Sequence, residues 1–182
     1  MKKMLPLILV GALAMGCATT ESASAPAAAA PAVATAAPAE AGGITVSPLP
    51  SSIASAAEAV GVIGIVKGAP VPKMPGVTVA KNSDGNAIVT WMTRIPGAEI
   101  QLMGAYENWK PDLGLVLDKV SVGNNRFVHV ISFLVKPTAT IIYKYMVNGN
   151  WTEDAMAPVS IDDGYGGHNG KIDVAAMLAA AK

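Results

Sequence analysis

The sequence predicts an all-β fold, an antiparallel sandwich of about six to eight short strands, for residues 76–175. All nine aromatic side chains of the 182-residue chain lie between Trp91 and Tyr165, so only this part can build an aromatic core. The same part consists of short apolar runs that are rich in Val, Ile, Thr and aromatic residues. Clusters of Gly, Pro, Asn and Asp separate these runs and indicate turns.

Four of the apolar runs are expected to be strands, because they are rich in β-branched residues and too short for typical helices. They are Ala87–Met92, Ala98–Met103, Arg126–Phe133 and Thr140–Val147. The last run ends at Asn148-Gly149, the most frequent dipeptide of tight hairpins, since both residues tolerate a positive φ. Its alternate residues point to opposite faces of a sheet. We expect the core face to hold Ile141, Tyr143, Tyr145 and Val147, and the other face to hold Ile142, Lys144 and Met146.

Residues 1–16 have the pattern of a signal peptide. Two lysines precede an apolar stretch, Met4–Met15, that is too short to span a bilayer. Residues 13–17 read Leu-Ala-Met-Gly-Cys and resemble the bacterial lipobox. That resemblance implies that Cys17 is lipidated and anchors the protein to a membrane, and Ala18 in place of Asp implies the outer membrane. The alternative is an ordinary secreted protein in which this single Cys has no role.

The segments on either side of the expected sandwich have different patterns. Residues 17–43 are rich in Ala, and their repeated prolines break helices, so they predict a flexible spacer. Residues 44–75 contain a stretch, Ile53–Val66, that is apolar enough to be a short helix or strand, but prolines bracket it. We expect an irregular arm that packs on the sandwich, with disorder or docking onto a partner as alternatives. Residues 176–182 are expected to be a C-terminal tail.

Charge and motif content argue against several function classes. The formal net charge is +0 and no basic run occurs, which argues against nucleic-acid binding. Common hydrolase, protease and phosphate-binding motifs are missing from the sequence, so neither catalytic residues nor a cofactor are expected. Only His129 and His168 are present and the one Cys is assigned to lipid, so no metal site is expected. His129 lies inside an apolar run and is interpreted as a hydrogen-bonded residue of a sheet. Four acidic residues are interpreted as charged loop residues: Glu153, Asp154, Asp162 and Asp163.

Three motifs follow one another in the order and spacing of a known family. They are residues 100–109 (IQLMGAYENW), 143–151 (YKYMVNGNW) and 166–169 (GGHN). In these motifs the chain resembles the glycogen-binding module of the AMP-activated protein kinase β subunit and of starch-branching and debranching enzymes, carbohydrate-binding module family 48. The resemblance covers residues from about 77 to 174 and implies an immunoglobulin-like (early-set) β-sandwich.

The resemblance also implies which side chains contact sugar. In glycogen-binding members the contacts come from two Trp, a Lys and an Asn, and their counterparts here are Trp109, Lys144, Trp151 and Asn169. Tyr165 stands where the kinase subunit has a Leu that reaches through the sugar ring, so it is a fifth candidate with a different mode of ring contact. Two other departures from the family pattern, Asn148 for Asp and Ala155 for Pro, concern turn geometry.

The chemistry of these residue types suits a glucan. A glucan presents apolar C–H faces edged by hydroxyls, so it is bound by flat aromatic rings beside hydrogen-bond donors and acceptors. Trp109 and Trp151 adjoin expected loops, whereas Trp91 ends an alternating run and is expected in the core. The alternatives are ordinary packing for the two loop tryptophans and a solvated surface charge for Lys144.

Two function classes therefore stay open. The first is a non-catalytic, envelope-anchored module that binds α-glucan or another oligosaccharide, which a separate enzyme would process. The second is a structural or protein-interaction lipoprotein that keeps the sandwich without binding sugar and has an envelope protein as partner. Fold alone does not decide between them.

Overall fold

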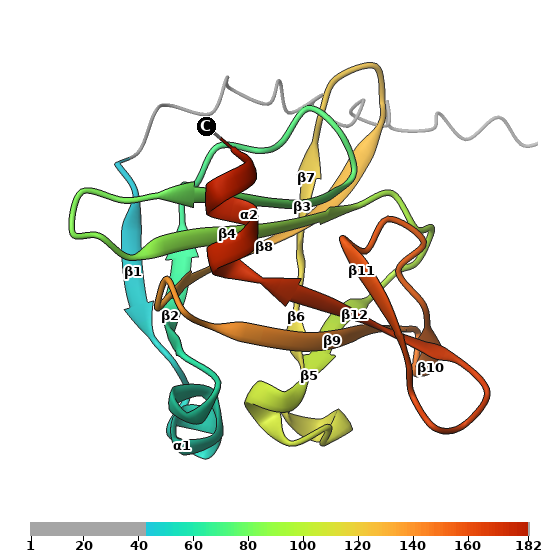
Figure 1. Cartoon of the computed structure of the whole chain (residues 1–182). Helices are drawn as coiled ribbons and strands as arrows, with labels where there is room; N and C mark the ends of the chain where they lie inside the picture. The colour runs from blue at the N-terminus through green and yellow to red at the C-terminus, as the bar shows by residue number, and fades with distance from the viewer. Residues whose placement is uncertain (1–42, 182) are drawn as a thin grey trace, which may run out of the picture. The chain divides into compact units, whose positions relative to one another are not determined.

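The computed structural model describes residues 43–181, which form two antiparallel β-sheets packed face to face (Figure 1). The prediction of an antiparallel sandwich is confirmed. The described residues hold twelve strands where about six to eight were expected, because several strands are only two to four residues long. The predicted signal peptide, Cys17 and nearly all of the spacer 17–43 lie outside the described residues.

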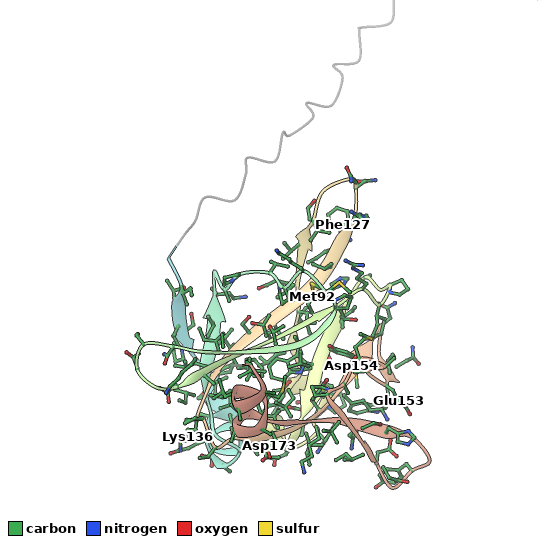
Figure 2. The ribbon with its side chains drawn as sticks, turned by 45° about the horizontal axis from the view of Figure 1, so that its top comes forward. Met92, Phe127, Lys136, Glu153, Asp154 and Asp173 are labelled. Carbon is green, nitrogen blue, oxygen red and sulfur yellow. The ribbon has the colours of Figure 1, made fainter. Side chains whose placement is uncertain are left out.

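The first sheet has the strand order β1-β2-β8-β4-β3, and β7 pairs with the first half of β8. Its strands are β1 (Thr45–Pro48), β2 (Val62–Lys67), β3 (Gly76–Lys81), β4 (Ala87–Thr93), β7 (Asp118–Ser121) and β8 (Phe127–Val135). The hairpin of β7 and β8 projects beyond the rest of the sheet, with Phe127 near its tip (Figure 2).

The second sheet has the strand order β11-β12-β9-β5-β6, and β10 pairs with the end of β9. Its strands are β5 (Ile100–Gly104), β6 (Leu115–Val116), β9 (Thr140–Val147), β10 (Asn150–Thr152), β11 (Val159–Asp162) and β12 (His168–Asp173). Two short 3-10 helices, η1 (Ala105–Glu107) and η2 (Pro111–Leu113), connect β5 to β6. The four strands predicted from the sequence correspond to β4, β5, β8 and β9, and the bounds of β9 agree at both ends.

The core lies between the sheets and is built from alternate residues of the central strands. Trp91 of β4 is fully buried, as predicted, and packs edge-on against Phe133 and Tyr143 with ring centroids 5.1 and 5.7 Å away. Tyr106 of η1 packs edge-on against Phe133 from another side, with centroids 5.3 Å apart. The predicted core face of β9 is confirmed, because Ile141, Tyr143, Tyr145 and Val147 all belong to this buried cluster.

Residues 44–75 depart most from the prediction. They hold β1, the helix α1 (Ser51–Ala59) and β2, which pairs with β8 in the interior of the first sheet. α1 buries Ile53 and Ala57, which lie four residues apart and so share one face of the helix. Pro48 is the last residue of β1 and Pro50 precedes α1, so neither interrupts the interior of an element. The irregular-arm prediction is therefore wrong for β1, α1 and β2, and the longest segment here without regular structure is the loop 68–75.

The end of the described chain is also more regular than expected. The helix α2 (Val174–Ala180) covers most of the predicted tail. Asp173 starts it as a cap, because its side chain accepts a 3.0 Å hydrogen bond from the backbone N–H of Ala176. Within residues 43–181, neither helix is long and apolar enough to cross a membrane.

His129 of β8 is buried but not hydrogen-bonded. It is 6% exposed, and neither ring nitrogen has a hydrogen-bond partner. Burial, the larger cause, and the nearby charge of Lys119 lower the pKa of His129. The interpretation of His129 as a hydrogen-bonded sheet residue is therefore wrong.

Candidate functional site

A groove on the outer face of the second sheet brings together all five sugar-contact candidates. It has a volume of about 720 Å³, and we call it the aromatic groove. It is lined by Trp109, Ile142, Lys144, Trp151, Ile161, Asp162, Asp163, Tyr165 and Asn169. Residues from five separate segments of the chain therefore meet on one face of the sandwich.

Strand register explains why these residues share a face. On β9, Tyr143 and Tyr145 point into the core, so Ile142 and Lys144 point to the outer face. Trp151 of β10 pairs with Met146 of β9 and therefore lies on the same side. On the other flank, Ile161 of β11 pairs with Asn169 of β12, and both line the groove.

The two groove tryptophans stand close together and are tilted to one another. Their ring centroids are 6.1 Å apart and the ring planes meet at 55°. Trp151 is 47% exposed, and Trp109 is half-buried. Trp151 follows the hairpin turn Asn148-Gly149, where both residues have positive φ as the sequence predicts.

Trp109 is held by an unusual stretch of backbone. Asn108 and Trp109 are consecutive non-glycine residues in the left-handed region, with φ of 57° and 59°. Such residues are strained and persist where their surroundings fix them. The N–H of Trp109 donates to the carbonyl of Gly104 at 3.1 Å, and the N–H of Gly104 donates to Glu107 Oε1 at 2.7 Å. These bonds fold the chain after β5 into a tight turn that presents the Trp109 ring.

Lys144 is paired within the groove. Its Nζ donates to Asp163 Oδ2 at 2.7 Å, and the two side chains are only 10% and 13% exposed. The hydrogen bond from Lys144, followed by those from the backbone N–H groups of Tyr165 and Gly167, lowers the pKa of Asp163 to about 2. Asp163 is therefore ionised near neutral pH.

Residues 162–168 form a compact turn that we call the Tyr165 loop. Asp163 Oδ1 accepts hydrogen bonds from the N–H groups of Tyr165 at 2.8 Å and Gly167 at 3.0 Å. Asp162 Oδ1 accepts from Gly164 N–H at 2.6 Å. Tyr165 itself is 96% exposed. Glu153 and Asp154 follow β10 directly and lie near one another (Figure 2).

Sequence reasoning missed four residues of the groove: Ile142, Ile161, Asp162 and Asp163. The alternation of β9 already placed Ile142 on the face of Lys144, so that signal was available. Asp162 and Asp163 were interpreted as ordinary charged loop residues. Nothing local in the sequence indicates that Asp163 pairs with a lysine 19 residues earlier.

The groove combines apolar, aromatic and polar side chains. Ile142 and Ile161 supply apolar surface and three aromatic rings supply flat surfaces. The polar groups are the Asn169 amide, the Lys144 ammonium and two carboxylates. Within residues 43–181, no group of three His, Cys, Asp or Glu side chains could hold a metal ion. A larger hollow of about 1060 Å³ lies over the first sheet, but none of the sugar-contact candidates lines it.

The sequence matches no protein-family model, and a search of curated proteins finds no similar protein.

Proposed function

We propose that the protein is a non-catalytic module that binds α-glucan, of the glycogen or starch type, in the aromatic groove. The observation that carries this proposal is the convergence of Trp109 and Trp151, 6.1 Å apart, with Tyr165 and Asn169 in one groove. The resemblance of the three sequence motifs to the glycogen-binding module of carbohydrate-binding module family 48 supports it. That resemblance points to Trp109, Lys144, Trp151 and Asn169.

The chemistry of the groove matches that of a glucose polymer. A glucose ring has apolar faces that stack on indole rings, and hydroxyl edges that Asn169 can serve as both donor and acceptor. If each indole covers about half of its roughly 200 Å², two indoles give about 5 kcal/mol at about 25 cal/mol/Å². Ordering costs reduce this figure, so we expect Kd values between roughly micromolar and millimolar. Many copies on one surface would strengthen the hold on a long polymer.

The test is retention of the full chain on glycogen beads, in a detergent whose headgroup is not a sugar. Trp109→Ala and Trp151→Ala should each elute earlier than the wild type, because each removes one stacking surface. Phe127→Ala is the matched control. Phe127 is 47% exposed, like Trp151, but lies on the β7–β8 hairpin outside the groove. Equal retention of all four proteins, or no retention of the wild type, would refute glucan binding.

We also propose that lipid on Cys17 anchors the protein to the cell envelope, at the outer membrane. The support is the charged start, the short apolar stretch and the lipobox-like residues 13–17. Cys17→Ser should move the protein from the membrane fraction to the soluble fraction, and mass spectrometry should show the loss of the acyl chains. A protein that sediments equally well with either residue at position 17 would rule out this anchor.

One observation favours a second function, a structural or protein-interaction lipoprotein without sugar binding. Lys144, the cation of the family's sugar site, already forms an ion pair with Asp163. If the groove binds no sugar, its exposed aromatic rings would instead contact an envelope protein. Cross-linking from position 165 in intact cells would capture that protein, and its yield would not fall when glucan is added.

A further inference from the structure

We propose that Lys144 is a positioning residue and not a sugar contact. In this proposal, which rests on glucan binding in the aromatic groove, the Lys144–Asp163 pair fixes the Tyr165 loop so that Tyr165 is a third aromatic surface for the sugar. The resemblance instead assigns Lys144 a direct role as hydrogen-bond donor to the sugar. The two roles differ in the expected effect of replacing Asp163: a positioning role predicts weaker sugar binding, and a direct role predicts binding that is unchanged or stronger.

The first observation is that the ammonium group of Lys144 is mostly buried and gives one of its three N–H donors to Asp163. Lys144 is 8% exposed, and its Nζ lies 2.7 Å from Asp163 Oδ2. A charge that has lost most of its contact with water needs a partner of opposite charge to stay ionised. A sugar hydroxyl is a neutral acceptor and cannot replace the carboxylate without leaving Asp163 uncompensated.

The second observation is that Asp163 connects the sheet to the backbone beside Tyr165. Its Oδ2 accepts from Lys144, while its Oδ1 accepts from the N–H groups of Tyr165 and Gly167. Lys144 lies on β9, which pairs with β5 on one side and β12 on the other and is therefore a rigid base. One carboxylate thus ties the exposed turn to the interior of the second sheet.

The third observation is the close packing of the Tyr165 loop on charged side chains. A Cβ atom at Gly167 would lie 2.8 Å from Asp163 Oδ2, 2.9 Å from Glu153 Oε1 and 3.1 Å from Lys144 Nζ. Only glycine fits there without a shift of these groups. Glu153 Oε1 also accepts from the N–H of His168 at 2.8 Å, so the loop is fixed at both ends.

The consequence concerns Tyr165. Its side chain is 96% exposed and lines the groove, so its position depends on the backbone of the loop that carries it. A loop ordered before binding loses less entropy when the sugar arrives. Loss of the Lys144–Asp163 pair should therefore weaken binding by the amount that Tyr165 contributes. A single stacking contact corresponds to about threefold to tenfold in Kd.

The test measures the affinity of the full chain for maltoheptaose by titration calorimetry, in a detergent without a sugar headgroup. Asp163→Asn keeps the size of the side chain and frees the ammonium of Lys144. We expect Asp163→Asn, Lys144→Met and Tyr165→Ala each to raise Kd about threefold to tenfold. We expect the double variant Lys144→Met/Asp163→Asn to lose no more than either single variant, because the two residues act as one unit.

A second variant keeps the result meaningful if a charge substitution disturbs folding. Gly167→Ala keeps both charges but crowds the ion pair and the loop, because its Cβ would meet Asp163 Oδ2 and Lys144 Nζ, so it should lose as much affinity as Tyr165→Ala. Gly43→Ala is its control, since nothing lies within 4 Å of a Cβ there. In hydrogen exchange without sugar, the amides of Tyr165 and Gly167 should exchange faster in Asp163→Asn and Lys144→Met.

The outcomes separate this inference from the proposed function. If the wild type binds and Trp109→Ala does not, but Asp163→Asn binds as well as the wild type or better, then Lys144 is a direct donor and the inference is overturned alone. If Lys144→Met loses affinity while Asp163→Asn does not, the conclusion is the same. If the wild type itself does not bind maltoheptaose, glucan binding and the inference that rests on it both fail.

Discussion

Glu107 is a buried acid whose replacement should stabilise the protein at alkaline pH. It is 1% exposed, Oε1 accepts from the N–H of Gly104 at 2.7 Å, and Oε2 has no hydrogen-bond partner. Burial raises the pKa of Glu107 to about 7, against the smaller lowering effect of backbone N–H groups. Between pH 4.5 and about 7 the folded protein therefore keeps a proton that the unfolded chain has lost.

The sign and size of the effect follow from that difference. Because the folded state binds more protons in this range, the free energy of unfolding falls as pH rises from 4.5, and the loss is complete above about 7. A pKa raised from 4.5 to about 7 corresponds to a loss of about 3 kcal/mol. Glu107→Gln has no charge to bury and keeps an acceptor for the N–H of Gly104.

The assay is urea unfolding followed by tryptophan fluorescence at two pH values. At pH 4.5 Glu107→Gln and the wild type should unfold at similar urea concentrations. At about pH 8.5 the variant should be more stable by up to about 3 kcal/mol. Glu58→Gln, at an exposed position of α1, should follow the wild type at both pH values. A Glu107→Gln protein whose stability difference from the wild type does not change with pH would refute the reasoning.

Three further predictions concern the stability of the fold. His129→Leu should gain stability relative to the wild type as pH falls from about 7 to about 5, measured by thermal melts. Burial lowers the pKa of His129, so in this range the unfolded chain takes up a proton more readily than the folded protein does. A difference in melting temperature that stays constant with pH would contradict this. Tyr143→Phe should lose about 1.5–3 kcal/mol in urea unfolding, since the Tyr143 hydroxyl donates to Asp154 Oδ2 at 2.6 Å. Tyr145→Phe, whose hydroxyl has no partner, should lose much less, and equal losses would contradict the assignment of the bond. Deletion of residues 43–67 should abolish cooperative unfolding, because it removes β2 from the first sheet, and a sharp calorimetric transition would refute this.

The strands that could be predicted are those whose own residues show a two-residue alternation or end at a recognisable turn. The residues of β9 alternate between core and outer face and end at an Asn-Gly turn, so both its bounds and its core face were predicted correctly. Trp91 was placed in the core for the same reason, since it ends an alternating run on β4. In these strands the side-chain period and the turn residues agree with the tertiary structure.

β2 was not assigned, because the sequence allowed a short helix or a strand within Ile53–Val66 and the evidence that decides between them is not local. Its pairing with β8 joins residues more than sixty positions apart, such as Val66 with Ser132. The preceding apolar residues of α1 are few, and nearby prolines suggested irregular structure. Only the position of β8 in the folded sheet makes Val62–Lys67 a strand, so tertiary pairing decided what propensity left open.

The groove shows the same division. Trp109, Trp151 and Asn169 were singled out from motifs, and the structure brings them to one face. The pairing of Lys144 with Asp163 depends on how the Tyr165 loop returns over β9, which spacing along the chain does not reveal. The sequence therefore predicted which residues would lie in one site, but not which of them would form an ion pair.

Both faces of β9 are in use: Tyr143 packs in the core, while its neighbour Lys144 lines the aromatic groove. Insertion or loss of one residue in this strand would turn every later side chain over, sending an ammonium group inward and a phenol outward. Descendants of this gene can therefore vary the strand by exchanging residues but not by changing its length by one. The groove residues of β9 and the core residues behind them therefore evolve under one constraint, the fixed length of this strand.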